Sequence, residues 1–385
     1  MKVCIATGTR AEYGLLKPLI DKIKMSPDLK LQLLVTGAHL SPEFGLTYKQ
    51  IEEDGLKIDA KVEMLLSSDT AEGITKSMGL GMIGYADAFG NLLPDLLIIL
   101  GDRYEMLSIA SAAIIFKIPI VHIHGGEITE GAYDDAIRHA ITKLSHLHFT
   151  STETYRQRVI QLGEKPERVF NVGAIGLDNV HSLSLMSKEQ MEEELQVKFK
   201  QFNYVIAFHP ETLAKMSVEA QFQNLLDAIE GEMDSFFVFT KANADTNGRI
   251  INQMIESFVS KNTEKSAMFS SLGSLKFLSL MRLTDAIVGN SSSGIIEAPS
   301  LNTATINIGD RQRGRIQALS VVNCSPDQYQ ISDAFKKIKS KEFKRILERI
   351  KNPYGSGNTS AKILDVLQSI HPECLTIKTF YDIGK

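Results

Sequence analysis

The chain has 385 residues, of which 43% are hydrophobic and 23% are charged, and its formal net charge is −4. This composition is that of a folded globular protein, and the slightly negative charge argues against a polyanionic partner such as nucleic acid. The length exceeds what one hydrophobic core usually spans, which predicts two domains.

The cysteines and the N-terminal sequence favour a reducing compartment. Cys4, Cys324 and Cys374 are far apart and lack C-x-x-C spacing, so neither a disulfide framework nor a cysteine metal site is expected. From Met1 the sequence runs directly into a short strand-like segment rather than a signal peptide, and no apolar stretch approaches membrane-spanning length. We therefore expect a cytoplasmic protein with no membrane partner.

Strand-like apolar runs alternate with helix-period segments along the chain, which is the pattern of βαβ units around parallel sheets. In the first half the predicted strands are residues 2–7, 31–36, 95–100, 118–123 and 146–150. In the second half they are residues 203–208, 235–240, 267–271, 285–289 and 303–308. The sequence thus predicts an α/β protein with two Rossmann-like domains.

The expected domains are 1–178 and 179–360, with the charged helical stretch 188–200 close to the boundary. After about residue 325 the sequence becomes helical and charged, and it breaks at the Pro and Gly residues of 352–357. An amphipathic helix follows at 361–370. We expect this C-terminal segment, 361–385, to pack back on the first domain.

The strand-end motif whose chemistry is clearest is a serine loop, Gly289–Gly294. It precedes a predicted helix that carries Glu297. Hydroxyls and free backbone N–H groups at such a place suit a phosphate or pyrophosphate, so Ser291, Ser292 and Ser293 are candidate ligands. The alternative is a serine-rich helix cap, which any α/β protein contains. The loop alone does not decide between the two.

Arginines at other strand ends favour the phosphate interpretation. Arg10, Arg103 and Arg311 each follow a predicted strand, and a guanidinium presents a planar fork of donors to phosphate oxygens. Arg313 is expected to be a solvated surface residue. A pyrophosphate would repel the Glu297 carboxylate unless that carboxylate bound a ribose diol instead. A ligand that carries both a pyrophosphate and a ribose is a nucleotide, so a nucleotide is the simplest interpretation. Asn243 follows another strand and suits a ribose, sugar or base contact, or simply a turn.

A second group of strand-end residues is acidic and rich in histidine. Its members are Asp102, His122, His124, Glu127, Asp134, Asp135, Arg138 and His139. Such a cluster is suited to removing and delivering protons, although one of the paired aspartates is expected only to cap a helix. His-x-His with nearby carboxylates is also typical of hydrolase metal sites. The Gly-Gly that follows favours close approach of a ligand, so metal is the secondary alternative.

His209 directly follows the strand that opens the second domain, and Pro210 ends that strand. At a ligand-binding edge this imidazole would bind phosphate or donate a proton, whereas the alternative is a histidine with only a backbone partner.

These motifs together resemble the hydrolysing UDP-N-acetylglucosamine 2-epimerases, in particular the bacterial branch that forms N-acetylmannosamine for sialic acid. The resemblance spans nearly the whole chain. It rests on Thr7–Gly14, Gly101–Glu105, His122–Glu127, Ile137–Lys143, Phe208–Thr212, Gly289–Gly294 and Ile306–Gln312.

The resemblance implies a fold shared with GT-B glycosyltransferases, an interdomain active-site cleft, a homodimer or homotetramer, and no metal or other cofactor. It places Arg10, His209, Ser291, Ser292 and Arg311 near the diphosphate and Glu297 on the ribose. Asp102 and Asp134 become acid/base candidates, with Glu127 and His124 beside them. Many relatives have glutamate where this chain has His124, which leaves open which group moves the C2 proton.

The expected activity is conversion of UDP-N-acetylglucosamine and water into UDP and N-acetylmannosamine through a 2-acetamidoglucal, the first step of sialic acid biosynthesis. One alternative is the same chemistry on a UDP-2,4-diacetamido-trideoxy sugar of the legionaminic acid pathway. A GT-B glycosyltransferase, a nucleotide-sugar binding module and a metal hydrolase are the further alternatives.

Overall fold

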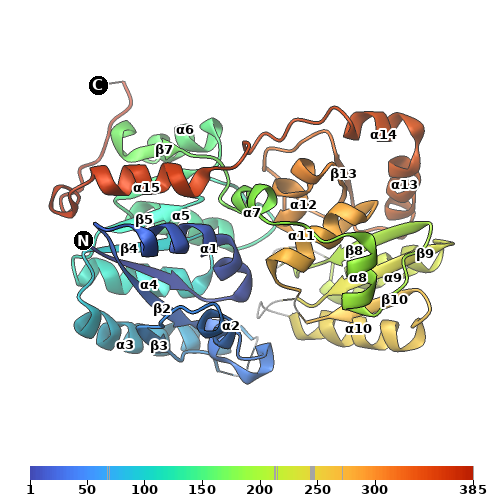
Figure 1. Cartoon of the computed structure of the whole chain (residues 1–385), viewed down its shortest axis with the longest axis horizontal. Helices are drawn as coiled ribbons and strands as arrows, with labels where there is room; N and C mark the ends of the chain where they lie inside the picture. The colour runs from blue at the N-terminus through green and yellow to red at the C-terminus, as the bar shows by residue number, and fades with distance from the viewer. Residues whose placement is uncertain are drawn as a thin grey trace. The chain divides into compact units, whose positions relative to one another are not determined.

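The computed structural model describes residues 1–385 except 67, 69, 212, 213, 215, 243–247, 271 and 385. The chain divides into two compact units, each built around its own parallel sheet (Figure 1). Unit 1 comprises Met1–Glu127, Asp134–Asp178 and Gly357–Lys385. Unit 2 comprises Ile128–Tyr133 and Asn179–Ser356. The short segment Ile128–Tyr133 groups with unit 2, which a single boundary at 178/179 does not anticipate.

The described residues of unit 1 form a seven-stranded sheet in the order β3-β2-β1-β4-β5-β6-β7, with every pair parallel. The strands are β1 (Lys2–Thr7), β2 (Lys30–Thr36), β3 (Ala60–Val62), β4 (Leu96–Leu100), β5 (Ile120–Ile123), β6 (Leu147–Thr150) and β7 (Val169–Asn171). The strand order reverses between β1 and β4. In doubly wound sheets, ligands bind beyond the carboxyl ends of the strands at this point.

Both faces of this sheet are covered, so its strands are continuously apolar. In β1, Val3 and Ile5 join one hydrophobic core, whereas Cys4 and Ala6 join the core on the opposite face. This alternation follows from the two-residue repeat of a strand, and burial on both faces is the rule for parallel sheets.

The helices of unit 1 lie on both faces of its sheet. They are α1 (Arg10–Met25), α2 (Tyr48–Glu53), α3 (Ala71–Leu92), α4 (Tyr104–Ile115), α5 (Asp134–Leu144), α6 (Glu153–Gln161) and α15 (Thr359–Ser369). Helix α7 (Gly176–Ser182) contains the point at which the chain passes from unit 1 to unit 2. Short 3-10 turns occupy η1 (Gly37–Leu40), η2 (Pro42–Phe44), η3 (Pro166–Arg168) and η5 (Pro372–Cys374). Helix α1 begins with a capping box, because Thr9 accepts from the N–H of Glu12 and the Glu12 carboxylate accepts from that of Thr9.

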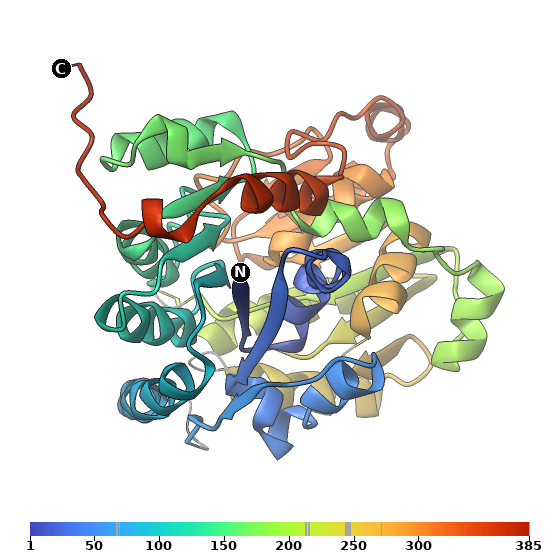
Figure 2. The ribbon, with the colours of Figure 1, turned by 60° about the vertical axis from the view of Figure 1, so that its left-hand side comes forward.

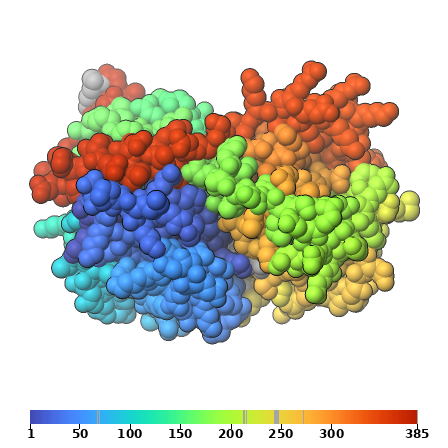
Figure 3. Space-filling model, in the orientation of Figure 1, coloured from blue at the N-terminus to red at the C-terminus, as the bar shows by residue number. Residues whose placement is uncertain are grey.

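The C-terminal segment returns to unit 1, as expected. Helix α15 packs on α1 and places Ile363 and Leu367 in the core that α1 also lines (Figure 2). The Asp178 carboxylate accepts from the N–H groups of Thr359 and Ser360, each at 2.7 Å, and so holds the start of α15. In the space-filling view the red C-terminal helix lies directly against the blue N-terminal residues (Figure 3).

Unit 2 repeats this architecture with a different sequence. Within the described ranges its sheet has the order β10-β9-β8-β11-β12-β13, again fully parallel, with the reversal between β8 and β11. The strands are β8 (Phe202–Ala207), β9 (Ser235–Thr240), β10 (Ser266–Phe269), β11 (Ala286–Gly289), β12 (Ala304–Ile308) and β13 (Val321–Cys324). Tyr204 and Ile206 face one core, and Val205 and Ala207 face the other.

The helices of unit 2 precede, connect or follow these strands. They are α8 (Lys188–Leu195), α9 (Val218–Glu230), α10 (Gly248–Lys261), α11 (Gly273–Leu283), α12 (Ser292–Ile296), η4 (Ala298–Leu301), α13 (Gln328–Lys339) and α14 (Lys341–Leu347). The predicted pair of Rossmann-like domains is therefore confirmed. Among the helices that the structure describes, none is long and apolar enough to cross a membrane.

Candidate functional site

Several predicted residues of unit 1 lie at the reversal point of its sheet. Arg10 begins α1 directly after β1, and Asp102 follows β4. Gly101 lies between the end of β4 and Asp102, and its backbone is in the left-handed region with φ of +78°. The carbonyl of Gly101 is 2.7 Å from Nε2 of His122. Burial lowers the pKa of His122 to about 3, so this imidazole is neutral and holds the loop that carries Asp102.

A buried arginine on α5 joins the predicted acidic residues. Arg138 is 2% exposed and pairs with the Asp102 carboxylate. Its Nη1 donates to the carbonyl of His124 at 2.8 Å and lies 3.9 Å from Oε2 of Glu127. The structure thus brings Asp102, His124 and Glu127 together around one cation. The guanidinium of Arg138 fixes the position of the Asp102 carboxylate, and a positioned carboxylate is a group suited to general base catalysis.

His124 occupies an unusual backbone conformation at the end of β5. Its φ is +66°, in a region that non-glycine residues rarely adopt, and its side chain is buried. Nε2 accepts a hydrogen bond from the N–H of Ile175 at 3.2 Å, and Nδ1 lies 3.3 Å from Oε1 of Glu127. The same Glu127 oxygen accepts from the Ser151 hydroxyl at 2.7 Å. His124 and Glu127 therefore belong to one internal network.

The aspartate pair opens α5, as the sequence predicts. Asp134 is the first residue of the helix and is half-buried, and Asp135 lies 3.6 Å from Nε2 of His139 one turn later. Because α5 also carries Arg138, this one helix positions Asp134 and the cation that holds Asp102. Acid/base roles for Asp102, Asp134, His124 and Glu127 remain predictions.

The two predicted arginines of unit 1 differ in their partners. Nε and Nη2 of Arg103 each lie 3.2 Å from the buried Glu105 carboxylate, so Arg103 is engaged within the protein. Arg10 is half-buried, and among the described residues no side chain pairs with it. Burial lowers the pKa of Arg10. A half-buried guanidinium without a carboxylate favours an anionic ligand, so the structure supports a phosphate contact for Arg10 more than for Arg103.

In unit 2, His209 and the serine loop meet at the reversal point between β8 and β11. His209 follows β8, and Asn290 and Ser291 follow β11. The Asn290 side chain accepts from the His209 N–H at 2.7 Å and donates to the His209 carbonyl at 2.8 Å. Asn290 lies within the serine loop, but the sequence alone does not indicate a role for it. Its fully buried side chain organises the loop that contains His209.

Arg311 reaches the same point from the end of β12. Its Nη1 donates to the carbonyl of Asn290 at 3.1 Å, and its backbone N–H donates to Glu211 at 2.9 Å. Burial raises the pKa of Glu211. A Cβ at Gly309 would lie 2.2 Å from Oε1 of Glu211, so this approach requires glycine. Glu211 is a second positioning group that sequence reasoning missed, although it lies in a motif that the resemblance uses.

The other residues of unit 2 that were predicted to contact the nucleotide are the three serines, Glu297 and Asn243. Ser292 and Ser293 open α12, which has only five residues, and Ser291 Oγ accepts from the Ser293 N–H at 3.4 Å. Glu297 is buried where α12 meets η4. Asn243 lies outside the described residues. Diphosphate and ribose contacts for these side chains therefore stay predictions.

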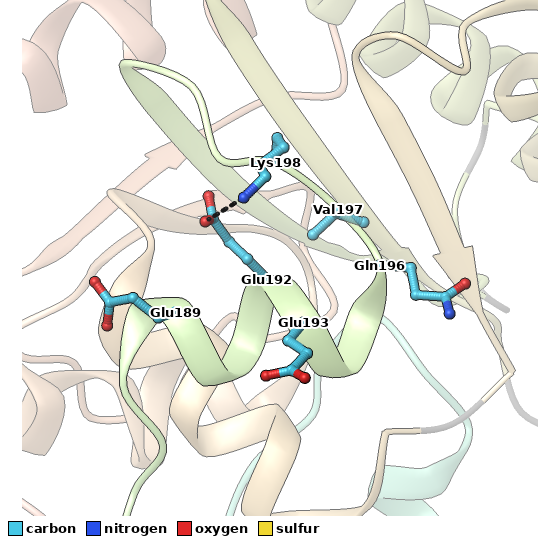
Figure 4. A pocket seen from close by; sticks show the side chains of 6 residues that line it. All are labelled: Glu189, Glu192, Glu193, Gln196, Val197 and Lys198. Carbon is cyan, nitrogen blue, oxygen red and sulfur yellow. Dashed lines mark hydrogen bonds and ion pairs between the residues drawn. The ribbon is translucent and has the colours of Figure 1, made fainter.

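A surface pocket on unit 2 lies elsewhere and has the wrong charge for a nucleotide. It lies along α8 and the turn that follows (Figure 4). It is lined by Glu189, Glu192, Glu193, Gln196, Val197 and Lys198. Lys198 pairs with Glu192 at 3.3 Å, which leaves a net negative lining that repels phosphate.

The metal alternative finds no geometric support in the part of the chain that the structure describes. No three His, Cys, Asp or Glu side chains come together there as a metal site requires. His122, the first residue of the His-x-His motif, points instead at the Gly101 carbonyl.

Comparisons with known proteins identify the family of the chain. The profile of a family described as UDP-N-acetylglucosamine 2-epimerase matches residues 21–368. The chain is 44% identical to the GDP/UDP-N,N'-diacetylbacillosamine 2-epimerase (hydrolyzing) of Campylobacter jejuni, over 99% of both proteins. It is 39% identical to the polysialic acid biosynthesis protein P7 of Escherichia coli, over 99% of this chain and 97% of P7.

The fold has solved counterparts. The structure of the UDP-GlcNAc 2-epimerase from Neisseria meningitidis bound to UDP-GlcNAc superposes with a TM-score of 0.80 at 20% identity. The match covers 96% of this chain and 100% of that one. It therefore extends over both sheets.

Proposed function

The chain belongs to the UDP-N-acetylglucosamine 2-epimerase family, and from this premise we propose that it is a hydrolysing 2-epimerase acting on a UDP-linked 2,4-diacetamido-trideoxy sugar. The proposed reaction consumes water and releases UDP and the free 2-epimer of that sugar. The observation that carries the proposal is the 44% identity, over 99% of both chains, to a hydrolysing diacetylbacillosamine 2-epimerase.

This substrate replaces the one that the sequence first favoured. UDP-N-acetylglucosamine, with N-acetylmannosamine for sialic acid as its product, becomes the second candidate. It is supported by the 39% identity to a polysialic acid biosynthesis protein. The two substrates share the 2-acetamido group and the glycosyl diphosphate, so the same chemistry serves either, and only the surroundings of C4 and C6 distinguish them.

The proposed chemistry begins with removal of the proton at C2 while the C1–O bond to the diphosphate breaks. The C–H electron pair forms the C1=C2 bond of a glycal, and the nucleoside diphosphate leaves with the electrons of the C1–O bond. Water then adds at C1, and a proton returns to C2 on the opposite face. Two faces require two proton-handling groups, for which Asp102 and Asp134 are our first candidates.

We assign the departing diphosphate to the strand-end groups of unit 2, and we retain Arg10 of unit 1 as a separate candidate phosphate contact. Arg311 and His209 are fixed through Asn290, so their donors need little reorganisation as negative charge develops on the leaving group. Arg10 supplies a cation without a competing carboxylate among the described residues. Preorganised donors of this kind stabilise a transition state more than water does.

Proton NMR in D₂O tests the proposal directly. The enzyme is incubated separately with UDP-N,N'-diacetylbacillosamine, its GDP-linked counterpart and UDP-N-acetylglucosamine. We expect release of free nucleotide and of a manno-configured sugar carrying deuterium at C2, fastest with the first substrate. Faster turnover of UDP-N-acetylglucosamine would favour the second candidate. Nucleotide release without deuterium at C2 would contradict elimination and hydration altogether.

A further inference from the structure

One buried residue of unit 2, Asn290, connects three strand ends through its side chain and its backbone carbonyl. Asn290 is fully buried, and its amide makes complementary hydrogen bonds to the backbone of His209 on β8's carboxyl side. Its own carbonyl accepts from Nη1 of Arg311 at 3.1 Å and from Nε2 of Gln312 at 2.8 Å. The loops after β8, β11 and β12 are therefore joined through a single residue.

The orientation of the Asn290 amide is determined by its partners. The His209 N–H is a donor and must face Oδ1, whereas the His209 carbonyl is an acceptor and must face Nδ2. An amide satisfies both with one rigid group. Aspartate has the same shape, but when ionised it has no donor and repels the carbonyl.

The backbone at this position is equally constrained. Gly289 has φ of +134°, and a Cβ there would lie 2.2 Å from the carbonyl oxygen of Ala207. The Asn290 N–H donates to that same oxygen at 3.1 Å. The end of β11 is thus pressed against the end of β8, which is what lets the Asn290 side chain reach His209.

We propose that Asn290 is a positioning residue that sets His209 and Arg311 for the departing diphosphate. This inference rests on the proposed function for the identity of the ligand. Asn290 does not touch the phosphate in this assignment. It fixes the backbone from which the His209 imidazole projects and restricts the guanidinium of Arg311, so the two donors are presented together.

The chain contains a matched control at the start of β8, the strand whose carboxyl end leads to His209. Asn203, near the start of β8, accepts from the N–H of Lys200 at 2.9 Å and donates to its carbonyl at 2.9 Å. The Asn203 side chain is also buried. Replacing Asn203 removes the same two hydrogen bonds at a similar depth, but away from the carboxyl edge of the sheet.

The experiment compares Asn290→Asp and Asn290→Ala with Asn203→Asp and Asn203→Ala. Melting temperature is measured first, followed by the Kd for UDP and for GDP by calorimetry, and by kcat and KM. We expect similar losses of melting temperature at both sites. Only the Asn290 variants should also weaken nucleotide binding, by about tenfold or more. If the Asn290 and Asn203 variants bind nucleotide equally, the inference is wrong.

A pH comparison separates positioning from general loosening, and it applies even if the alanine variant does not fold. A protonated aspartic acid offers one donor and one acceptor, as asparagine does. The nucleotide affinity of Asn290→Asp, relative to that of the wild type, should therefore increase as the pH is lowered from about 8 to about 5.5. A constant ratio would overturn the inference.

The outcomes for the two proposals are distinct. If the wild-type protein binds a nucleotide but turns over none of the three nucleotide sugars, the proposed function is wrong. The binding comparison would still decide the role of Asn290. Wild-type protein that binds neither nucleotide would overturn both.

Discussion

Nε2 of His124 accepts a hydrogen bond from the backbone N–H of Ile175 at 3.2 Å, which places the proton of the neutral ring on Nδ1. That nitrogen lies 3.3 Å from the Glu127 carboxylate. The lone pair that a base would use is thus directed at the backbone. This geometry suits His124 to orienting the Glu127 carboxylate. It suits His124 less well to acting as the base that removes the proton at C2.

The variant His124→Asn tests this distinction, because asparagine tolerates the left-handed backbone that this position requires. A lost general base costs about 10²–10⁴-fold in rate, so we expect a fall in kcat below about 10²-fold. Deuterium incorporation at C2, followed by NMR, should continue at the slower rate. A larger loss with unchanged nucleotide affinity would identify His124 as a proton-transfer group.

Asp102→Asn should act much more strongly. The change removes the carboxylate that faces Arg138 and is our candidate base, so kcat should fall by about 10³-fold or more while the Kd for nucleotide changes little. Asp95→Asn provides the comparison, because Asp95 precedes β4 and accepts from the N–H of Lys2 at 2.6 Å. Turnover of the Asp102 variant at the wild-type rate would exclude Asp102 from the mechanism.

The main elements of the fold were predictable because ten of the strands are apolar runs flanked by turn residues. The three strands that sequence reasoning missed are β3, β7 and β13, which comprise Ala60–Val62, Val169–Asn171 and Val321–Cys324. Each lies at an edge of its sheet. β3 and β7 have only three residues each, too few to show a period, and the pairing of all three edge strands depends on neighbours distant in the sequence.

The candidate site was predictable to the level of residue types at strand ends. What the sequence could not provide was the partner of each side chain. In the sequence, Arg103 is as plausible a phosphate-binding residue as Arg10. In the structure, however, Arg103 is paired with Glu105, two residues later. Asn290 and Glu211 were missed because their function lies in hydrogen bonds to the backbone of other loops, which leave no spacing signal.

Buried histidines make unit 1 sensitive to acid. Burial lowers the pKa of His39 to about 4, of His122 to about 3 and of His146 to about 4. Histidine in an unfolded chain titrates near pH 6.5, so as the pH falls below this value the unfolded state binds protons that the folded state does not. Stability should therefore be retained above about pH 6.5 and decrease from there towards pH 4.

Thermal unfolding between pH 7 and pH 5 measures this effect, with His39→Gln as the variant. We expect the melting temperature of the wild type to fall with pH and that of the variant to fall less, since one proton-binding difference is removed. The pKa of Glu164 is lowered to about 2, because hydrogen bonds from His148 and Lys143 outweigh its burial. The stabilisation from Glu164 is therefore lost only below about pH 4.3, outside the range of this measurement. Identical slopes for both proteins would refute the assignment to His39.

Two neighbouring arginines of unit 2 allow a closely matched test of the diphosphate assignment. The guanidinium of Arg311 donates to the Asn290 carbonyl, and the Glu211 carboxylate accepts from the Arg311 backbone N–H. The side chain of Arg313 is 66% exposed and lies 3.1 Å from Glu130. A charge-assisted hydrogen bond to phosphate contributes about 1.5–3 kcal/mol, so Arg311→Met should raise the Kd for nucleotide by about 10–100-fold.

Arg313→Met removes the same charge only two residues away and should leave the Kd within about twofold of wild type, because exposed ion pairs contribute little. Calorimetry at two salt concentrations distinguishes a local contact from a general loss of positive potential. A local contact predicts that the difference between the two variants persists at high salt, where the Debye length is about 3 Å at 1 M. Equal weakening by both variants would show that net charge, rather than the position of Arg311 beside Asn290, binds the diphosphate.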